Sequence, residues 1–382
     1  MSLEEKISEL NYKYQFVKNN KYWNYNQVYD LTINDKVYQI SENDVLLNIS
    51  HNIAKNINGS FNNKKYMSDY EIPNIDIEQM KKIVIGFYMQ VNPELSNKIA
   101  FILSKTDFIK YDENIPSNLQ RSVTTSEGIK LYYKNDLNSL VTLAHELSHG
   151  ISNLGDDLRL KDSKGVESLS EVESMLTEEL FLDYLKNINL QIKEKGSNNE
   201  VRTLDDNIIN DIKYDKYKGV IHTAYRAIDE LEIKKVLESN KIDNIDEDFI
   251  DKLSNSMNIS KEEMIKKIDM FVSRYYPNDN QIHDYIGVVD YDLRNGQQLS
   301  NEARFIYANC LVEKLNGMNL DNQQKIEFYK MYLNNAKNMS FQEVLKLFNV
   351  DLTNPYNFYE EFISEFNTLS NDDTFQRGTH QL

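Results

Sequence analysis

The chain has 382 residues, of which 40% are hydrophobic, so it can bury a sizeable core. With 43 Lys and Arg against 60 Asp and Glu, the net charge of −17 argues against a partner such as nucleic acid or an anionic membrane. The single cysteine, Cys310, excludes a disulfide framework and a zinc site built from cysteines. The absence of a long apolar run and of a basic leader predicts a cytoplasmic protein, although export as an effector stays open.

The first 75 residues are expected to form an N-terminal helical region that contains one short hairpin. Residues 3–22 alternate charged and apolar side chains at helical spacing, which predicts a helix. Asn34 and Asp35 separate two short runs rich in β-branched and aromatic residues, which is typical of a hairpin. A second helix is predicted over residues 41–56.

Residues 76–369 carry mostly helical patterns and form the predicted catalytic region. Asn92 and Pro93 predict the start of a helix, because proline is favoured at the first helical position. Residues 99–103 fit either the end of that helix or a strand, and alternation within 123–135 predicts a strand. Helices are predicted over residues 75–90, 136–154, 165–191, 207–239, 247–254, 260–274, 299–315, 321–337, 340–348 and 355–367. Polar loops or tails are predicted over residues 59–75, 193–206 and 370–382.

A metal-binding motif lies in the helix predicted over residues 136–154. His145, Glu146 and His149 form an H-E-x-x-H sequence. The four-residue spacing places the two imidazoles one turn apart, about 5–6 Å between Cβ atoms, so both can bind one Zn²⁺. The apolar face of the helix, which includes Leu143 and Leu147, lies elsewhere, and this favours metal ligands over two buried core histidines.

A catalytic zinc site needs a third protein ligand, and the following helix is rich in glutamate. This helix is apolar nearly all round, so a carboxylate on it must be paired or bind a metal. Glu171 and Glu178 share one face, whereas Glu173 lies nearer the main apolar face, and this position favours Glu171 as the ligand. The alternatives are a solvated acidic stripe, or a ligand from Asp156 or Asp157.

Two segments resemble the thimet oligopeptidase and oligoendopeptidase-F family. Residues 142–149, preceded by residues 131–135, resemble the zinc helix of that family and the strand before it. Glu171-Val-Glu-Ser-Met-Leu-Thr-Glu178 resembles the family's E-x-x-S-x-x-x-E segment, which implies Glu171 as zinc ligand and Glu178 as a supporting carboxylate.

The resemblance covers residues 131–185 and departs from the family at two positions. Ser148 replaces the usual glycine of the motif, and Ser152 stands where a histidine often follows. Neither departure removes a ligand. The chain is also much shorter than the usual members of the family.

The resemblance implies a gluzincin: a mainly α-helical, zincin-like metallopeptidase with two helical lobes around a cleft. A small β element would precede the zinc helix, and an extended substrate could pair with an edge strand near residues 129–133. Zinc on His145, His149 and Glu171 would leave a position for water, with Glu146 as general base in the hydrolysis of a peptide or an exposed protein segment.

The family supplies a donor for the tetrahedral oxyanion from a downstream segment rich in His and Tyr. The matching residues are Tyr285, His283 and Tyr291, in that order of preference, and a structural loop with buried tyrosines is the alternative. His222 and Tyr225 lie on a separate helix and could also face the cleft. From another class, a helical binding or toxin-type interaction protein with a structural or inactive zinc site would fit the same motif.

Overall fold

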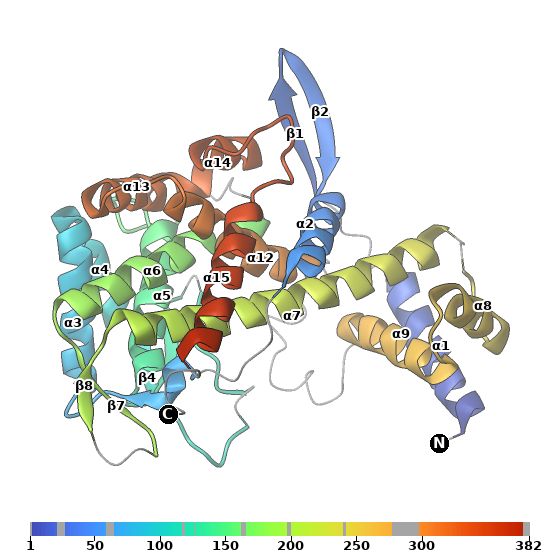
Figure 1. Cartoon of the computed structure of the whole chain (residues 1–382), viewed down its shortest axis with the longest axis horizontal. Coiled ribbons are helices and arrows are strands. Elements are labelled where there is room, and N and C mark those ends of the chain that lie inside the picture. The colour runs from blue at the N-terminus through green and yellow to red at the C-terminus, as the bar shows by residue number, and fades with distance from the viewer. Residues whose placement is uncertain are drawn as a thin grey trace. The chain divides into compact units, whose positions relative to one another are not determined.

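The computed structural model describes residues 2–20, 27–58, 65–116, 119–125, 127–161, 166–196, 200–239, 242–276 and 298–376. Contacts group the chain into two compact units, Met1–Lys55 with Ile221–Ala303 and Asn56–Val220 with Arg304–Leu382. The first unit thus combines the N-terminal segment with a distant one. The prediction of a mainly helical protein is confirmed (Figure 1). No helix among these residues has the length and apolar character that a membrane span requires.

The first unit consists of helices and one hairpin. Its complete elements are α1 (Leu3–Asn20), β1 (Val28–Ile33), β2 (Lys36–Ser41), α8 (Glu247–Met257) and α9 (Lys261–Tyr275), and most of α2 (Glu42–Asn56) belongs to it. The predicted hairpin is confirmed, since β1 and β2 pair antiparallel around Asn34 and Asp35, with φ of 49° and 62°. Positive φ at both central residues is what a tight two-residue turn requires.

The second unit holds the predicted zinc helix. Its complete helices are α3 (Ile77–Val91), α4 (Ser96–Ser104), α5 (Leu137–Asn153), α6 (Val172–Asn187), α13 (Asn322–Asn335), α14 (Phe341–Leu347) and α15 (Glu360–Gln376). Two further helices have residues in both units, α7 (Asp206–Ser239) and α12 (Gln298–Asn316). The predicted helix start at Asn92 is present as a 3-10 turn, Pro93–Leu95, directly before α4, and residues 99–103 belong to α4.

Two small sheets complete the second unit. In the first, β7 (Gln191–Glu194) lies between β3 (Tyr70–Glu71) and β8 (Val201–Thr203). These strands correct the prediction of a loop over residues 193–206, because short polar strands carry little signal until their partners are known. In the second sheet, β6 (Ile129–Tyr133) lies between β4 (Thr106–Lys110), which is parallel to it, and the antiparallel β5 (Val123–Thr124).

This second sheet changes one expectation about substrate binding. Strand β6 is central, so the prediction that residues 129–133 form an edge strand is wrong. The edges of the sheet are β4 and β5. The predicted β element before the zinc helix is confirmed, since β6 ends four residues before α5 begins at Leu137.

Helix α5 is anchored at its start and along its apolar face. The Asp136 carboxylate accepts hydrogen bonds from the Ser139 backbone N–H at 2.9 Å and from the Ser139 hydroxyl at 2.8 Å. Such a cap satisfies free donors at the first turn of a helix. Leu140, Leu143 and Leu147 are fully buried, as the apolar pattern predicted. The packing of this face fixes the rotation of the helix, and therefore the direction in which His145 and His149 point.

Candidate metal centre

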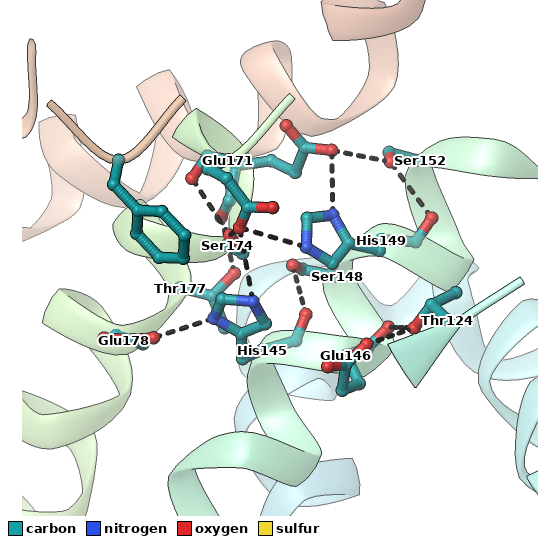
Figure 2. A network of polar contacts seen from close by, with 12 residues as sticks. Thr124, His145, Glu146, Ser148, His149, Ser152, Glu171, Ser174, Thr177 and Glu178 are labelled. Atoms are coloured by element: carbon teal, nitrogen blue, oxygen red, sulfur yellow. Dashed lines mark hydrogen bonds and ion pairs between the residues drawn. The ribbon is translucent and has the colours of Figure 1, made fainter. Parts of the chain in front are cut away.

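Three predicted ligands converge between α5 and the start of α6. His145 and His149 extend from α5, and Glu171 occupies the N-cap position of α6 (Figure 2). The Glu171 Oε2 atom lies 3.4 Å from Nε2 of His145 and 3.4 Å from Nε2 of His149. Two ligand atoms of a tetrahedral zinc ion, each about 2.0–2.1 Å from the metal, lie about 3.4 Å apart. The distances from Glu171 to the two imidazoles therefore fit zinc, and all three ligand atoms lie within 4.8 Å of one another.

The second nitrogen of each imidazole faces another carboxylate. His145 Nδ1 lies 2.7 Å from Glu178 Oε1, and the other oxygen of Glu178 accepts a hydrogen bond from Lys216 Nζ at 2.8 Å. His149 Nδ1 lies 3.3 Å from Glu173 Oε1. These carboxylates favour a proton on Nδ1 and leave Nε2 as the ligand atom, which is the usual arrangement around metal-binding histidines.

Hydroxyl groups hold two of the carboxylates in place. Ser174 donates to Oε2 of Glu171 at 3.0 Å, and Ser152 donates to Oε1 of Glu173 at 3.1 Å. Ser152 is the residue that stands where the resembling family often has a histidine. Its hydroxyl is buried and serves the carboxylate behind His149, so the departure at this position leaves that imidazole supported.

The charges of this cluster are balanced without a metal. Burial lowers the pKa of both imidazoles, but their carboxylate partners outweigh it and raise the pKa of His145 to about 9 and that of His149 to about 10. Burial raises the pKa of Glu171, yet the two histidines hold that pKa well below its ordinary value. Burial also opposes ionisation of Glu178, whereas Lys216 and His145 lower its pKa to about 2. A divalent cation could thus replace the two imidazolium protons at little change in local charge.

Glu146 lies on another side of α5 from the ligand cluster. Its Oε2 atom accepts a hydrogen bond of 2.6 Å from the Thr124 hydroxyl of β5 (Figure 2). Glu146 and His145 both line a cavity of about 500 Å³, which Glu178 and Thr142 also line. The predicted general base therefore borders a space that can hold a ligand next to one of the predicted metal ligands.

The alternative third ligands lie outside the cluster. Asp156 is fully exposed and pairs with Lys98 at 3.0 Å. Asp157 accepts a hydrogen bond of 3.1 Å from the Arg159 backbone N–H. Among the residues that the structure describes, the one group of His, Cys, Asp and Glu able to hold a metal is His145, His149 and Glu171.

The predicted oxyanion donors His283, Tyr285 and Tyr291 lie outside the described residues. Their roles stay predictions. His222 and Tyr225 lie on α7, in the unit that does not contain the metal cluster, and both are exposed.

Sequence reasoning missed Glu173 as a partner of His149. The predicted helix start at residue 165 is wrong, because a 3-10 turn over Glu167–Leu169 precedes α6, which begins at Val172. The prediction that Glu173 lies near the apolar side of the helix agrees with its 1% exposed side chain. That side packs against α5, where it meets His149. A carboxylate on an apolar face was the available signal, since such a group needs a partner.

The chain has only weak similarity to known proteins. No protein-family model and no curated protein matches the chain. A solved structure described as an oligoendopeptidase F matches with 11% identity and a TM-score of 0.49, over 88% of this chain and 58% of its own. PZ peptidase A with an inhibitor matches with 10% identity and a TM-score of 0.48, over 96% and 58%.

A structure described as a peptidase from Chlamydophila abortus matches with 12% identity and a TM-score of 0.42, over 86% of this chain and 53% of its own. The chain thus spans between 53% and 58% of the length of these three structures. Similarity at this level carries no conclusion about activity.

Proposed function

We propose that the chain is a zinc-dependent metallopeptidase that hydrolyses internal bonds of peptides or of exposed protein segments. The observation that carries this proposal is the convergence of His145 Nε2, His149 Nε2 and Glu171 Oε2 next to a cavity that Glu146 borders. Three protein ligands are the number that leaves a catalytic zinc ion with an open position. When bound, the zinc ion would supply Lewis-acid polarisation of the scissile carbonyl and a water molecule with a lowered pKa.

Glu146 is the residue proposed to move protons in this reaction. Its carboxylate would accept a proton from the attacking water and pass it to the leaving amine. The Thr124 hydroxyl donates to Oε2 of Glu146, which holds the side chain and leaves Oε1 as the basic oxygen. Thr124 is therefore proposed as a positioning residue, since it acts through Glu146.

The carboxylates behind the histidines complete the proposed roles. Glu178 and Glu173 would hold the imidazoles of His145 and His149 with Nε2 directed at the metal. Tyr285, His283 and Tyr291 stay candidates for the donor that stabilises the oxyanion, on the resemblance alone.

The direct test combines metal analysis with peptide hydrolysis. The purified chain is expected to contain about one zinc per molecule, to hydrolyse an unstructured peptide, and to lose that activity on chelation and regain it with zinc. A protein that holds zinc but shows no turnover with Glu146 intact would favour a helical binding or toxin-type protein with a structural zinc site. A protein that binds no zinc would refute both proposals.

A further inference from the structure

The cavity next to the metal centre has a positively charged wall. Arg121 and Lys134 both line this cavity of about 500 Å³, together with Tyr111 and Tyr132. We call these four residues the cationic wall. Within the described part of the chain, neither Arg121 nor Lys134 has a carboxylate at ion-pair distance, and the Lys134 ammonium lies 3.8 Å from the centre of the Tyr111 ring.

The carboxylates that also line the cavity do not neutralise this wall. Asp136 caps α5 and lies 3.4 Å from Lys195. Glu178 is shared between His145 and Lys216, as described above. The third carboxylate, Glu146, accepts its hydrogen bond from a threonine. Asp136 and Glu178 therefore each have a lysine partner outside the cationic wall, and Glu146 forms no ion pair with Arg121 or Lys134.

The sheet explains why these side chains gather on one wall. Tyr132 is the second-last residue of β6 and Lys134 follows the strand directly, so both lie at this end of β6. The Tyr132 backbone N–H donates to the Ser122 hydroxyl at 3.1 Å, so Arg121, which comes two residues before β5, lies beside this end of β6. Tyr111 comes directly after β4, beside the same end of β6, and its N–H donates to the Tyr133 carbonyl at 2.9 Å.

We propose that the cationic wall binds a carboxylate of the substrate, so that a peptide with this carboxylate binds more tightly than its neutral counterpart. This inference rests on the proposed peptidase function. An arginine fork can hold a carboxylate with two hydrogen bonds, while Lys134 adds a compact positive charge and the tyrosines add aromatic surface. The carboxylate could be the C-terminus of a short peptide or the side chain of an Asp or Glu residue, since both offer the same two oxygens.

Binding to the zinc-loaded Glu146→Gln protein tests this without requiring turnover. Three peptides of one neutral sequence are compared by calorimetry: one amidated at its C-terminus, one with a free C-terminal carboxylate, and one amidated with a central Gln replaced by Glu. We expect at least one carboxylate peptide to bind about tenfold more tightly than the neutral amide, and that peptide identifies the source of the carboxylate. Affinities that all agree within about twofold would overturn the inference.

Charge-removing variants in the same background locate the preference. Arg121→Gln and Lys134→Gln are each expected to reduce it several-fold, and the double variant to abolish it. Lys110→Gln is the matched control, because Lys110 is exposed at the end of β4, lies opposite Tyr133 in the register, and does not line the cavity. A preference that survives in the double variant would overturn the inference. A wild-type protein that hydrolyses none of the three peptides would instead refute the peptidase function. The binding data would still show whether the cationic wall binds a carboxylate.

Discussion

The two sides of helix α5 partner their charged groups in different ways. On the ligand side, three buried or mostly buried carboxylates, Glu171, Glu173 and Glu178, all contact an imidazole. On the cavity side, Arg121 and Lys134 are without a carboxylate among the described residues. The ligand side is therefore preorganised to bind one small cation, whereas the cavity side has positive charge that is available to a larger ligand. Substitutions on the ligand side should change metal affinity, and those on the cavity side should change turnover with the metal retained.

The largest effect is expected for Glu146→Gln on the cavity side. The amide is nearly the same size and can still accept the Thr124 hydrogen bond, but it cannot accept the proton of the attacking water. We expect kcat to fall about a thousandfold, within the usual range for general-base catalysis, with zinc content unchanged. Metal analysis and peptide hydrolysis on the same preparation measure the zinc content and kcat. A variant that hydrolyses at the wild-type rate would remove Glu146 from the mechanism.

The predicted oxyanion donor should behave like a cavity-side residue. If Tyr285 donates to the oxyanion, the interaction forms mainly in the transition state, so Tyr285→Phe should lower kcat about a hundredfold with KM little changed. Zinc content should stay normal. Tyr291→Phe and His283→Ala are compared in the same assay. Loss of activity in only one of these two variants would assign the role of donor to that residue. Full activity in all three variants would limit the correspondence with the resembling family to the zinc-binding helices.

The stability of the metal-free fold and the affinity for zinc should change in opposite directions as the pH rises. The ordinary pKa of histidine is about 6.5, and the metal-free fold raises the pKa of His145 to about 9 and that of His149 to about 10. The protonated imidazoles therefore stabilise the metal-free fold fully below about pH 6.5, and this stabilisation is lost as the pH rises through 9 and 10.

Zinc binds the neutral imidazoles, so its affinity should rise with pH, by up to about a hundredfold per pH unit if both protons are displaced. Thermal unfolding from about pH 6 to 9, with and without zinc, checks the two signs. Calorimetry in buffers of different ionisation enthalpy should show release of about two protons per zinc near pH 7. Zinc affinity that does not depend on pH would contradict the charge balance described for the cluster.

The sequence predicted the elements that have local signals. The turn at Asn34 and Asp35 and the helix start at Asn92 all depend on residues next to one another in the chain. The short strands β7 and β8 were missed, because they are short and polar and because β7 also pairs with β3, which lies more than a hundred positions away in the chain. Strand β6 was predicted, but its central place in the sheet was not, since β4 contributes no distinct pattern.

The same division holds within the candidate metal centre. His145 and His149 were predicted from their spacing along one helix, and Glu171 from a pattern in the next segment. Glu173 and Thr124 were not, because their roles appear only when another element packs against α5. A helical wheel ranks the faces of one helix, but it cannot say which face meets a histidine of its neighbour.

On the ligand side, Glu178 and Glu173 are the two carboxylates that contact Nδ1 of the imidazoles. Glu178→Gln and Glu173→Gln each keep an oxygen that can accept from Nδ1 but remove the negative charge, which should lower zinc affinity between about tenfold and a hundredfold. Glu178→Gln should have the larger effect, because the contact to His145 is 2.7 Å and that of Glu173 to His149 is 3.3 Å. Competition with a chromophoric chelator measures both affinities.

Two further variants provide reference values for these zinc affinities. Glu171→Ala removes a ligand and should weaken zinc binding more than either glutamine variant. Glu179→Gln is the matched control, because Glu179 follows Glu178 in α6 but pairs with Lys213 at 2.6 Å instead of with a histidine, so zinc affinity should match the wild type. If Glu173→Gln also matches the wild type, the contact to His149 does not orient the ligand, and Glu173 contributes only to the packing between α5 and α6. If Glu173→Gln weakens zinc binding while Glu179→Gln does not, the buried carboxylate acts through His149, and an acidic residue on an apolar helix face becomes a usable signal for a metal site on the neighbouring helix.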